Sequence, residues 1–295
     1  VAGGVVADGC ALISSGDRFV PAHGELVGEV EIDRLVDPVR VRDQGGVALK
    51  LLVLHRPDQP AHTRISMVEE FVAQGSRVAF VDIDATTAAD TLERCAALEP
   101  RHLPSFHEVD LVDIPATQRV IGRVLEELGS ITVLVNNAAS DDRHTWEEMT
   151  PQYWDDRLNT NLRHYFFCIQ AVAPQMIEAG NGSIVNIGSS SYMMQEDFFP
   201  GYAIAKSGVE GITRTMARTF GPSGVRVNTV LPGWVATERQ LTKWWTPEGE
   251  AATLRDQAIK RRILPREFAQ MVLFLAADDG AACTAQQFLV DGGRF

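Results

Sequence analysis

From residue 67 onward, short apolar runs alternate with longer segments in which apolar residues recur every three or four positions. The short runs have the length of strands, and their continuous Val, Ile and Leu content is typical of strands buried on both faces of a sheet. The longer segments have the period of amphipathic helices. This alternation predicts an α/β fold with helices on both faces of a parallel sheet.

The short runs predict seven strands, over residues 47–54, 77–83, 105–111, 131–137, 183–189, 225–231 and 287–293. The periodic segments predict helices over residues 67–75, 86–98, 115–128, 150–180 and 266–277, and a further helix that starts near Gly201. We therefore expect a doubly wound, parallel, seven-stranded sheet of the Rossmann type in a single domain. Ligands of such sheets bind at the carboxyl ends of the strands, so the residues that follow each strand are the candidates for chemistry.

Residues 1–46 do not follow this alternation. They are rich in Gly and Val and contain no helical pattern of useful length. We predict an atypical N-terminal extension of low order over residues 1–46 and the Rossmann-type domain over residues 47–295.

Composition narrows the classes of partner. The formal net charge of −12 over 295 residues offers no basic face for a phosphate backbone or an anionic membrane, so we expect neither nucleic-acid nor membrane partners. No apolar stretch reaches the length of a membrane span, and the first residues do not resemble a secretory signal. The cysteines lie far apart and lack the spacing of a metal site or a disulfide framework: Cys10, Cys95, Cys168 and Cys283. These features predict a cytoplasmic protein without a bound metal.

Tyr202 and Lys206 lie four residues apart in the sequence YAIAK. On a helix both side chains fall on one face, one turn apart. A free tyrosine titrates near pH 10, so a tyrosine base near neutrality needs its phenolate stabilised by about 3 pH units, or about 4 kcal/mol. A nearby ammonium group is the natural means. An isolated Tyr and Lys at this spacing are usually only neighbours on the surface. Whether this pair is catalytic therefore depends on the other residues of the sequence.

Other polar residues occur where the predicted sheet would bring them close to this pair. Ser189 follows a buried strand directly, in NIGSSS, and its hydroxyl is suited to hydrogen-bond a substrate oxygen. Asn161 is a polar residue in an aromatic and aliphatic helix, within LNTNLRH. The small residues and amides of NNAA (136–139) end another strand, and PGWVAT (232–237) ends a third. Small residues at a strand end let a flat cofactor approach the backbone.

With these motifs in this order, followed by a closing VDGG, residues 67–295 resemble the short-chain dehydrogenase/reductase family. The resemblance implies a catalytic set of Asn161, Ser189, Tyr202 and Lys206. Tyr202 would exchange the proton and Ser189 would orient the reacting oxygen. Lys206 would lower the pKa of Tyr202 and hold the nicotinamide ribose, while Asn161 would support a water relay.

The resemblance also implies a nicotinamide cofactor. Asp82, at the end of RVAFVD, stands where an acidic residue binds the adenosine ribose hydroxyls and repels a 2′-phosphate, which favours NAD over NADP. Asp84 is the local competitor for this role, and Asp110, expected on the adenine side, has a turn or helix cap as its alternative. The full set of expected cofactor contacts is Asp82, Asp110, Asn137, Ala138, Tyr202, Lys206, Pro232, Gly233, Val235 and Thr237.

The turn after the first strand departs from the family pattern. Relatives carry a glycine-rich turn there that receives the pyrophosphate, but residues 57–64 read PDQPAHTR. Pro57 and Pro60 remove two N–H donors, and the side chains of Asp58 and Gln59 would crowd a phosphate. Weaker pyrophosphate binding is expected.

Two explanations for this turn remain open. Arg56, His62 and Arg64 would replace the backbone donors with cationic side chains. Alternatively, the stretch before Met67 is not the sequence around which the fold was shaped, for instance through a shifted reading frame. The abrupt start of the resemblance at Met67 favours the second explanation.

Several stretches look most like NAD-dependent aldose dehydrogenases of the D-xylose 1-dehydrogenase type, including DDRH (141–144), YWDDRLNTNLRH (153–164) and WWTPEGEA (244–251). A pyranose has many hydroxyls and two apolar faces, so its pocket needs polar groups and flat aromatic rings. The expected substrate contacts are Asp141, Ser191, Gln195 and Trp234, and Trp244 and Trp245 are candidates for a lid. The predicted reaction is oxidation of an aldose at its anomeric carbon to a lactone, with NAD as acceptor.

Two other functions remain open. A chain without the phosphate turn fits a scaffold or binding protein that keeps the dehydrogenase fold, and nucleotide affinity separates this from an enzyme. Within enzymes, the substrate would instead be another secondary alcohol, an oxo-acyl group or a polyol. The last strand and the helix at 150–180 resemble family surfaces that pair subunits, so we expect a homodimer or homotetramer.

Overall fold

The computed structural model describes residues 50–54, 61–194 and 197–295. These residues all belong to one compact unit, residues 39–295. Residues 1–46, the proline-containing part of the turn at 55–60, and Gln195 lie outside the described residues. The predictions for the extension, for the phosphate turn and for Gln195 therefore stay predictions.

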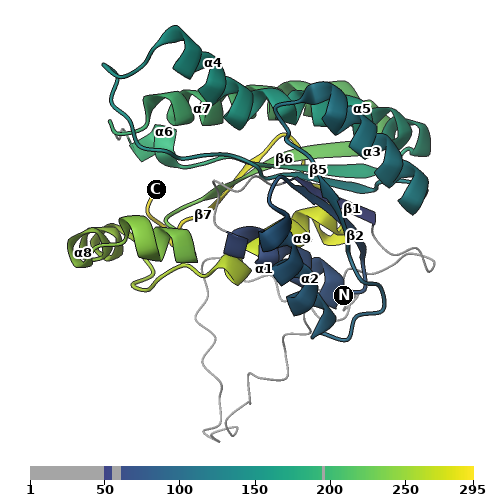
Figure 1. Cartoon of the computed structure of the whole chain (residues 1–295), viewed down its shortest axis with the longest axis horizontal. Helices are drawn as coiled ribbons and strands as arrows, with labels where there is room; N and C mark the ends of the chain where they lie inside the picture. Colours follow the sequence, from purple (N-terminus) through teal and green to yellow (C-terminus); the bar gives the residue numbers. More distant parts are fainter. Residues whose placement is uncertain (1–49, 55–60, 195–196) are drawn as a thin grey trace, which may run out of the picture. The chain divides into compact units, whose positions relative to one another are not determined.

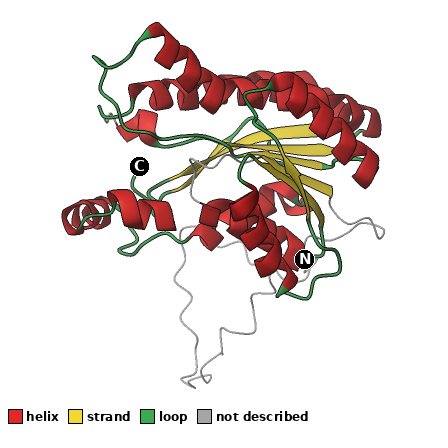
Figure 2. Ribbon diagram, in the orientation of Figure 1, coloured by secondary structure: helices red, strands yellow, loops and turns green. Residues whose placement is uncertain are grey.

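Seven strands form one sheet in the order β3-β2-β1-β4-β5-β6-β7, and every neighbouring pair is parallel (Figures 1 and 2). This confirms the predicted parallel α/β fold. The strand order reverses between β1 and β4, so the carboxyl ends of these two strands form the topological switch point where such sheets bind ligands. The strands are β1 (Lys50–Leu54), β2 (Arg77–Asp82), β3 (Ser105–Glu108), β4 (Val133–Asn136), β5 (Gly182–Ile187), β6 (Val225–Pro232) and β7 (Gln287–Val290).

Helices cover both faces of the sheet, as the red ribbons above and below the yellow strands show in Figure 2. Successive strand residues point to opposite faces. Phe80 accordingly belongs to the core cluster beneath α1 and α9, whereas Val81 belongs to the cluster beneath α3 and α5. One face carries α1 (Ala61–Ala73), α2 (Ala85–Ala96) and α9 (Pro265–Ala276), and the other carries α3 (Ile114–Leu128), α4 (Pro151–Leu158), α5 (His164–Ala179) and α7 (Pro200–Phe220).

The predicted helix over residues 150–180 is in fact two helices. A π-helical turn, Asn159–Arg163, separates α4 from α5. Turns of this kind are rare and are frequent at functional sites. The polar side chain of Asn161 bonds outside the regular ladder here, which apolar periodicity alone does not reveal. Gly180, with φ of +65°, ends α5 in the left-handed conformation that glycine adopts readily.

Other elements differ from the sequence prediction at their ends. Helix α1 starts at Ala61, six residues before the apolar pattern at Met67. Strand β3 ends at Glu108 rather than at 111, because Asp110 turns the chain by accepting a hydrogen bond from the N–H of Val112 at 3.0 Å. Between β6 and α9 lie two unpredicted elements, a π-helical turn, Gln240–Trp244, and helix α8 (Pro247–Asp256).

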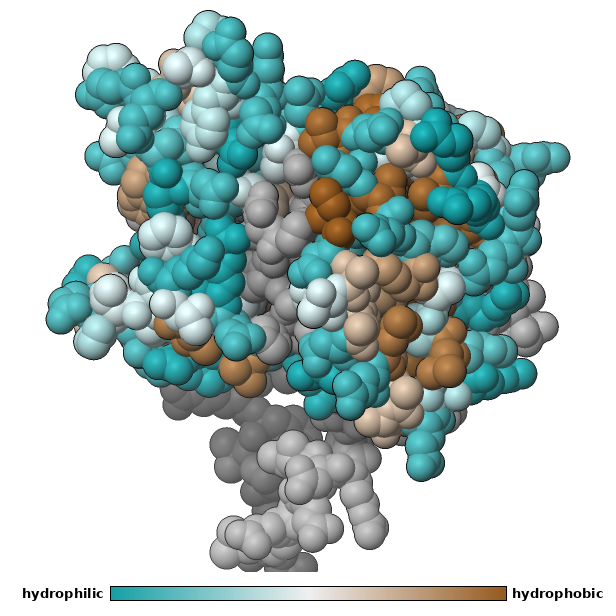
Figure 3. Space-filling view, in the orientation of Figure 1, coloured by the Kyte–Doolittle hydropathy of each residue, from teal (hydrophilic) through white to brown (hydrophobic). Residues whose placement is uncertain are grey.

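Two surface properties complete the fold. On the face shown in Figure 3, apolar residues gather on the side that carries the sheet, whereas polar residues dominate over α4 and α8. Within the part of the chain that the structure describes, no helix has both the length and the apolar character needed to cross a bilayer.

Candidate active site

A cavity of about 540 Å³ opens at the carboxyl ends of β5 and β6. Its lining includes Tyr202 of helix α7 and several residues of the segment after β6. Ten residues predicted for catalysis, cofactor or substrate line this cavity: Asn137, Asp141, Ser189, Ser191, Tyr202, Pro232, Gly233, Trp234, Val235 and Thr237.

Helix α7 carries the tyrosine and the lysine on its buried face, as the sequence predicts. Pro200 begins the helix, where its missing N–H costs no hydrogen bond. Tyr202 is 8% exposed and Lys206 is 1% exposed, and the lysine Nζ lies 5.7 Å from the centroid of the Tyr202 ring. The two side chains therefore lie on the same buried face of α7, and of the two only Tyr202 lines the cavity.

Burial is the largest influence on the charge of both residues. It raises the pKa of Tyr202 above its usual value, and the carboxylate of Asp141 acts in the same direction. A hydrogen bond from Ser189 and the charges of Arg143 and Arg239 lower the pKa of Tyr202. Burial lowers the pKa of Lys206 to about 7, against the effect of Asp141. Tyr202 is therefore a protonated phenol at neutral pH, and the predicted influence of Lys206 on it stays a prediction.

Ser189 stands two residues beyond the end of β5 and lines the cavity together with Tyr202, whose pKa it lowers. Its Oγ also accepts the N–H of Ser191 at 3.1 Å, which fixes the hydroxyl toward the cavity. Ser191 itself is buried, and its Oγ makes no hydrogen bond among the described residues. The serines thus offer polar groups at the point where the reacting oxygen of a substrate would lie.

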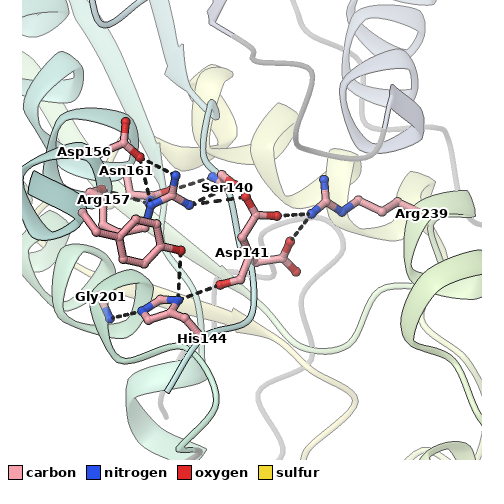
Figure 4. A network of polar contacts seen from close by, with 10 residues as sticks. Ser140, Asp141, His144, Asp156, Arg157, Asn161, Gly201 and Arg239 are labelled. Atoms are coloured by element: carbon pink, nitrogen blue, oxygen red, sulfur yellow. Dashed lines mark hydrogen bonds and ion pairs between the residues drawn. The ribbon is translucent and has the colours of Figure 1, made fainter. Parts of the chain in front are cut away.

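Asn161 is fully buried in the π-helical turn between α4 and α5. Its Oδ1 accepts the N–H of Ser140 at 2.6 Å, and its Nδ2 donates to the carbonyl of Arg157 at 3.0 Å (Figure 4). The side chain therefore joins the loop after β4 to the end of α4. Asn161 does not line the cavity, and its predicted water relay stays a prediction.

The loop after β4 is held by a network of polar contacts (Figure 4). Asp142 accepts from the Ser140 hydroxyl at 2.9 Å and pairs with Arg157 at 3.5 Å and Arg239 at 3.1 Å. Burial would raise the pKa of Asp142, but Ser140 and Arg239 together hold it below the usual value. Asp142, the second residue of DDRH, thus stabilises the loop and does not line the cavity.

His144, the last residue of that stretch, connects the loop to α7. Its Nδ1 lies 2.9 Å from the carbonyl of Asp142, and its Nε2 accepts the N–H of Gly201 at 3.1 Å. This pair of contacts fits a neutral imidazole with its proton on Nδ1. His144 therefore caps the first turn of the helix that carries Tyr202.

Most of the predicted cofactor residues lie at or just after the ends of several strands, including β2, β3, β4 and β6. Asp82 is fully buried at the end of β2, and its Oδ1 accepts the N–H of Asp84 at 3.0 Å. Asp84 caps α2 by accepting the N–H groups of Thr86 and Thr87. The carboxylate of Asp84 is thus used as a helix cap, and Asp82 is the acidic residue at the end of the strand. Asp110 forms the turn described above, and its predicted contact on the adenine side stays a prediction.

The other strand ends suit a flat cofactor. Ala138 is fully buried beside Asn137, whose buried Nδ2 has no hydrogen-bond partner among the described residues. Gly233 must lack a side chain, since a Cβ there would lie 2.7 Å from the Cα of Asp291. Thr237 is buried and accepts the N–H of Gln240 at 3.3 Å. An unpaired amide beside small residues fits the polar carboxamide and the ring of a nicotinamide.

Comparison with known proteins identifies the family. Residues 65–294 match a family described as enoyl-(acyl carrier protein) reductase. The chain is 43% identical over 230 residues to a probable galactose dehydrogenase, GalD, of Rhizobium meliloti, covering 78% of this chain and 90% of the relative. It is 44% identical over 224 residues to D-xylose 1-dehydrogenase of Caulobacter vibrioides, covering 76% and 87%. The chain belongs to the short-chain dehydrogenase/reductase family.

A solved member of this family shows the same fold. A 3-oxoacyl-(acyl-carrier protein) reductase from Brucella melitensis, with bound NAD, superposes with a TM-score of 0.73 at 25% identity, covering 92% of this chain and 98% of that one. The predicted oxidoreductase class is confirmed. The protein is a short-chain dehydrogenase whose relatives include sugar dehydrogenases.

The lining of the cavity also includes the aromatic residues Trp234 and Trp244. The rings of Trp234 and Trp245 stack with centroids 4.3 Å apart, and the Trp234 Nε1 donates to Gln240 at 2.8 Å. Gln240 in turn donates to the Asp141 Oδ2 at 3.0 Å, and Arg239 pairs with the same carboxylate at 3.1 Å. Gln240 and Arg239 therefore connect the segment after β6, which holds the lid candidates, to Asp141 in the loop after β4.

Several residues of the site escaped the sequence prediction. Arg143 was considered only as part of the DDRH stretch, but its guanidinium lies 4.0 Å from the ring centroid of Phe198 and lines the cavity. Arg239 and Gln240 lie three and four residues beyond Ala236, in a segment without a regular pattern. Arg294, which lines the cavity from beyond β7, carries no motif at all. Only the fold brings them to the site.

Proposed function

We propose that this protein oxidises the anomeric hydroxyl of an aldose, such as D-xylose or galactose, to a lactone with NAD as the hydride acceptor. The observation that carries the proposal is Tyr202, which lines the cavity together with Ser189 and lies one helical turn from Lys206. Galactose and D-xylose dehydrogenases at 43% and 44% identity support the sugar as substrate class.

In the proposed reaction, Ser189 holds the anomeric oxygen and Tyr202 takes its proton. A bound nicotinamide would supply the acceptor for the hydride that leaves the anomeric carbon. Arg143 and Arg239 lower the pKa of Tyr202 but do not offset its burial. Its phenolate would therefore also need the positive charges of Lys206 and of the bound cofactor. In the reverse direction, the same protonated phenol is ready to donate to a carbonyl.

Asp82 supports NAD as the cofactor. It is the carboxylate at the end of β2, the strand next to β1 in the sheet, while Asp84 is held as a helix cap. A carboxylate at this position accepts hydrogen bonds from ribose hydroxyls and repels a 2′-phosphate. Asn137 and Thr237 would then meet the carboxamide of the nicotinamide, and Val235 its ring.

The substrate end of the cavity supports a sugar over a steroid or an acyl chain. Asp141, Ser191 and Gln240 offer polar atoms, and Trp234 and Trp244 offer flat aromatic surfaces. A pyranose uses both, because its hydroxyls need hydrogen-bond partners while its C–H faces pack on rings. The galactose and D-xylose relatives point to the same substrate class. Which sugar is used is the finer question for experiment.

The experiment has two arms. NAD and NADP are titrated against the protein with quenching of tryptophan fluorescence as the readout, and a panel of aldoses, polyols and secondary alcohols is then assayed for NADH formation. We expect micromolar to submillimolar NAD binding and turnover of aldoses above polyols and alcohols. Absent NAD binding would favour the scaffold alternative, and turnover of polyols alone would reject the sugar oxidation.

The prediction of a homodimer or homotetramer is kept as part of this proposal. Exposed apolar side chains lie on helices α4, α5 and α7, namely Trp154, Phe166, Ile177 and Ile204. Large exposed apolar residues on adjacent helices favour association with another subunit. Light scattering at several protein concentrations measures the subunit number.

A further inference from the structure

Lys206 is held by two hydrogen bonds from outside its own helix. Its Nζ donates to the hydroxyl of Tyr165 at 2.8 Å and to the carbonyl of Ile187 at 2.7 Å. Ile187 ends β5, two residues before Ser189, and Tyr165 is the second residue of α5. The lysine is therefore anchored between the central sheet and the helix that follows the π-helical turn.

Tyr165 is fully buried, and its hydroxyl donates its single proton to the carbonyl of Ile187 at 2.9 Å. With that proton committed, only lone pairs of the phenol oxygen face Lys206. The contact at 2.8 Å is then an N–H donated by the lysine and accepted by the phenol. An ammonium group has three such protons, so two are fixed and one is left for the side of Tyr202.

We propose that Tyr165 is a positioning residue that keeps Lys206 charged and aims its remaining proton toward the site of proton transfer. The inference rests on the proposed function of Tyr202 and Lys206 and adds to it a second tyrosine, which touches neither substrate nor cofactor. Tyr165 acts through Lys206 alone. Its phenol oxygen accepts a hydrogen bond from the ammonium group, as a water molecule would do for an exposed lysine.

The groups around the lysine explain why one acceptor matters. Tyr165 faces it from α5, Tyr202 from α7, and the charge of Asp141 acts on it from the loop after β4. Burial lowers the pKa of Lys206 to about 7. At that value a single hydrogen bond decides whether the lysine is mainly charged or mainly neutral at neutral pH.

Tyr165 itself stays neutral in this arrangement. Burial raises its pKa well above the usual value, and the charges of Tyr202 and Cys168 act in the same direction. The ring of His164 lies 4.7 Å from that of Tyr165. A neutral phenol in this position accepts a hydrogen bond from the lysine without competing for its proton.

The chain allows a direct test because it has only four lysines: Lys50, Lys206, Lys243 and Lys260. Protein labelled with carbon-13 at the lysine Cε is titrated by NMR, and the Lys206 signal is assigned by its loss in Lys206→Arg. In Tyr165→Phe we expect the midpoint of Lys206 to fall by about one pH unit, the size expected for one hydrogen bond to a charged group. This readout needs no turnover.

The substitution keeps the shape of the side chain, and the Ile187 carbonyl keeps Lys206 as its donor, so the variant is expected to fold. Tyr192→Phe is the matched control, because its hydroxyl accepts from Gln287 at 3.0 Å, away from the lysine. An unchanged Lys206 midpoint in Tyr165→Phe would overturn the proposal. A raised midpoint would overturn it as well, since the phenol would then be stabilising the neutral amine.

Kinetics separate the positioning role from a merely structural one. In Tyr165→Phe, kcat/KM for sugar oxidation at pH 7 should fall about tenfold and recover at higher pH, because the phenolate of Tyr202 has lost support from a charged lysine. A loss that is equal at every pH would contradict the inference. If the unaltered protein shows no turnover, the proposed function fails while the lysine titration still decides the inference.

A second measurement covers the case in which Tyr165→Phe does not fold. In unaltered protein labelled at the tyrosine Cζ, the signal of Tyr165 should move with the same midpoint as that of Lys206. A Tyr165 signal that stays constant through the Lys206 titration would show that the two side chains are not coupled.

Discussion

The imidazole Nε2 of His144 accepts the backbone N–H of Gly201 at 3.1 Å, directly before Tyr202. The first N–H groups of a helix have no partner within the helix, and a nearby side chain usually caps them. Here the cap comes from a loop 57 residues earlier in the chain. The position of the proposed base is therefore set by the loop after β4 as well as by its own helix.

Replacing His144 with Ala should lower the free energy of unfolding by about 0.5–2 kcal/mol, the usual effect of losing a helix cap. It should also lower kcat more than it raises KM for the sugar, because Tyr202 is no longer fixed. Urea unfolding and NADH formation measure the two effects. His107→Ala is the matched control, since His107 pairs with Glu127 on an exposed surface. Equal behaviour of the two variants would contradict the role of His144.

The pH dependence of oxidation should respond to Asp141. Its carboxylate raises the pKa of Tyr202, so Asp141→Asn should lower that pKa, and activity should persist to lower pH than in the unaltered protein. Asp142→Asn is the comparison, because Asp142 also pairs with Arg239 but is half exposed. A pH–rate profile of kcat/KM for each variant checks the sign. A midpoint that moves upward in Asp141→Asn would contradict the electrostatic account.

The sequence predicts the parts of the site that local chemistry determines. The spacing of Tyr202 and Lys206 is a helical period, and Ser189 follows an apolar strand, so both places follow from pattern alone. Arg239 and Gln240 both contact Asp141, although Gln240 and Asp141 lie 99 residues apart in the sequence. No periodicity encodes such a contact. The π-helical turn at Asn161 also escaped, because α-helix flanks it on both sides and the whole segment has the composition of one helix.

The two aspartates near the end of β2 should separate cofactor recognition from helix stability. Asp82→Ala should weaken NAD binding and narrow the preference over NADP, because the carboxylate that repels a 2′-phosphate is gone. Asp84→Ala should leave that preference unchanged and destabilise the fold by about 1 kcal/mol, through loss of the α2 cap. Dissociation constants for both nucleotides and urea unfolding distinguish the two. The assignment to Asp82 is wrong if Asp84→Ala alone changes the preference.

The aromatic end of the cavity should act on sugar binding. Trp234→Ala removes the ring that stacks on Trp245 at 4.3 Å, and the KM for the sugar should rise about tenfold with a smaller effect on kcat. Trp146→Ala is the control, because that ring is 73% exposed and does not line the cavity. Steady-state kinetics with the preferred aldose provide the measurement. An unchanged KM in Trp234→Ala would show that the Trp234 ring does not contact the sugar.

The most direct test of the central claim is the rate of NADH formation in Tyr202→Phe with a saturating aldose. Loss of the phenol that exchanges the proton should lower kcat about a hundredfold to ten-thousandfold, with unfolding and NAD binding close to those of the unaltered protein. Tyr192→Phe should retain full activity. Turnover by Tyr202→Phe at the rate of the unaltered protein would show that another group removes the proton and would contradict the account.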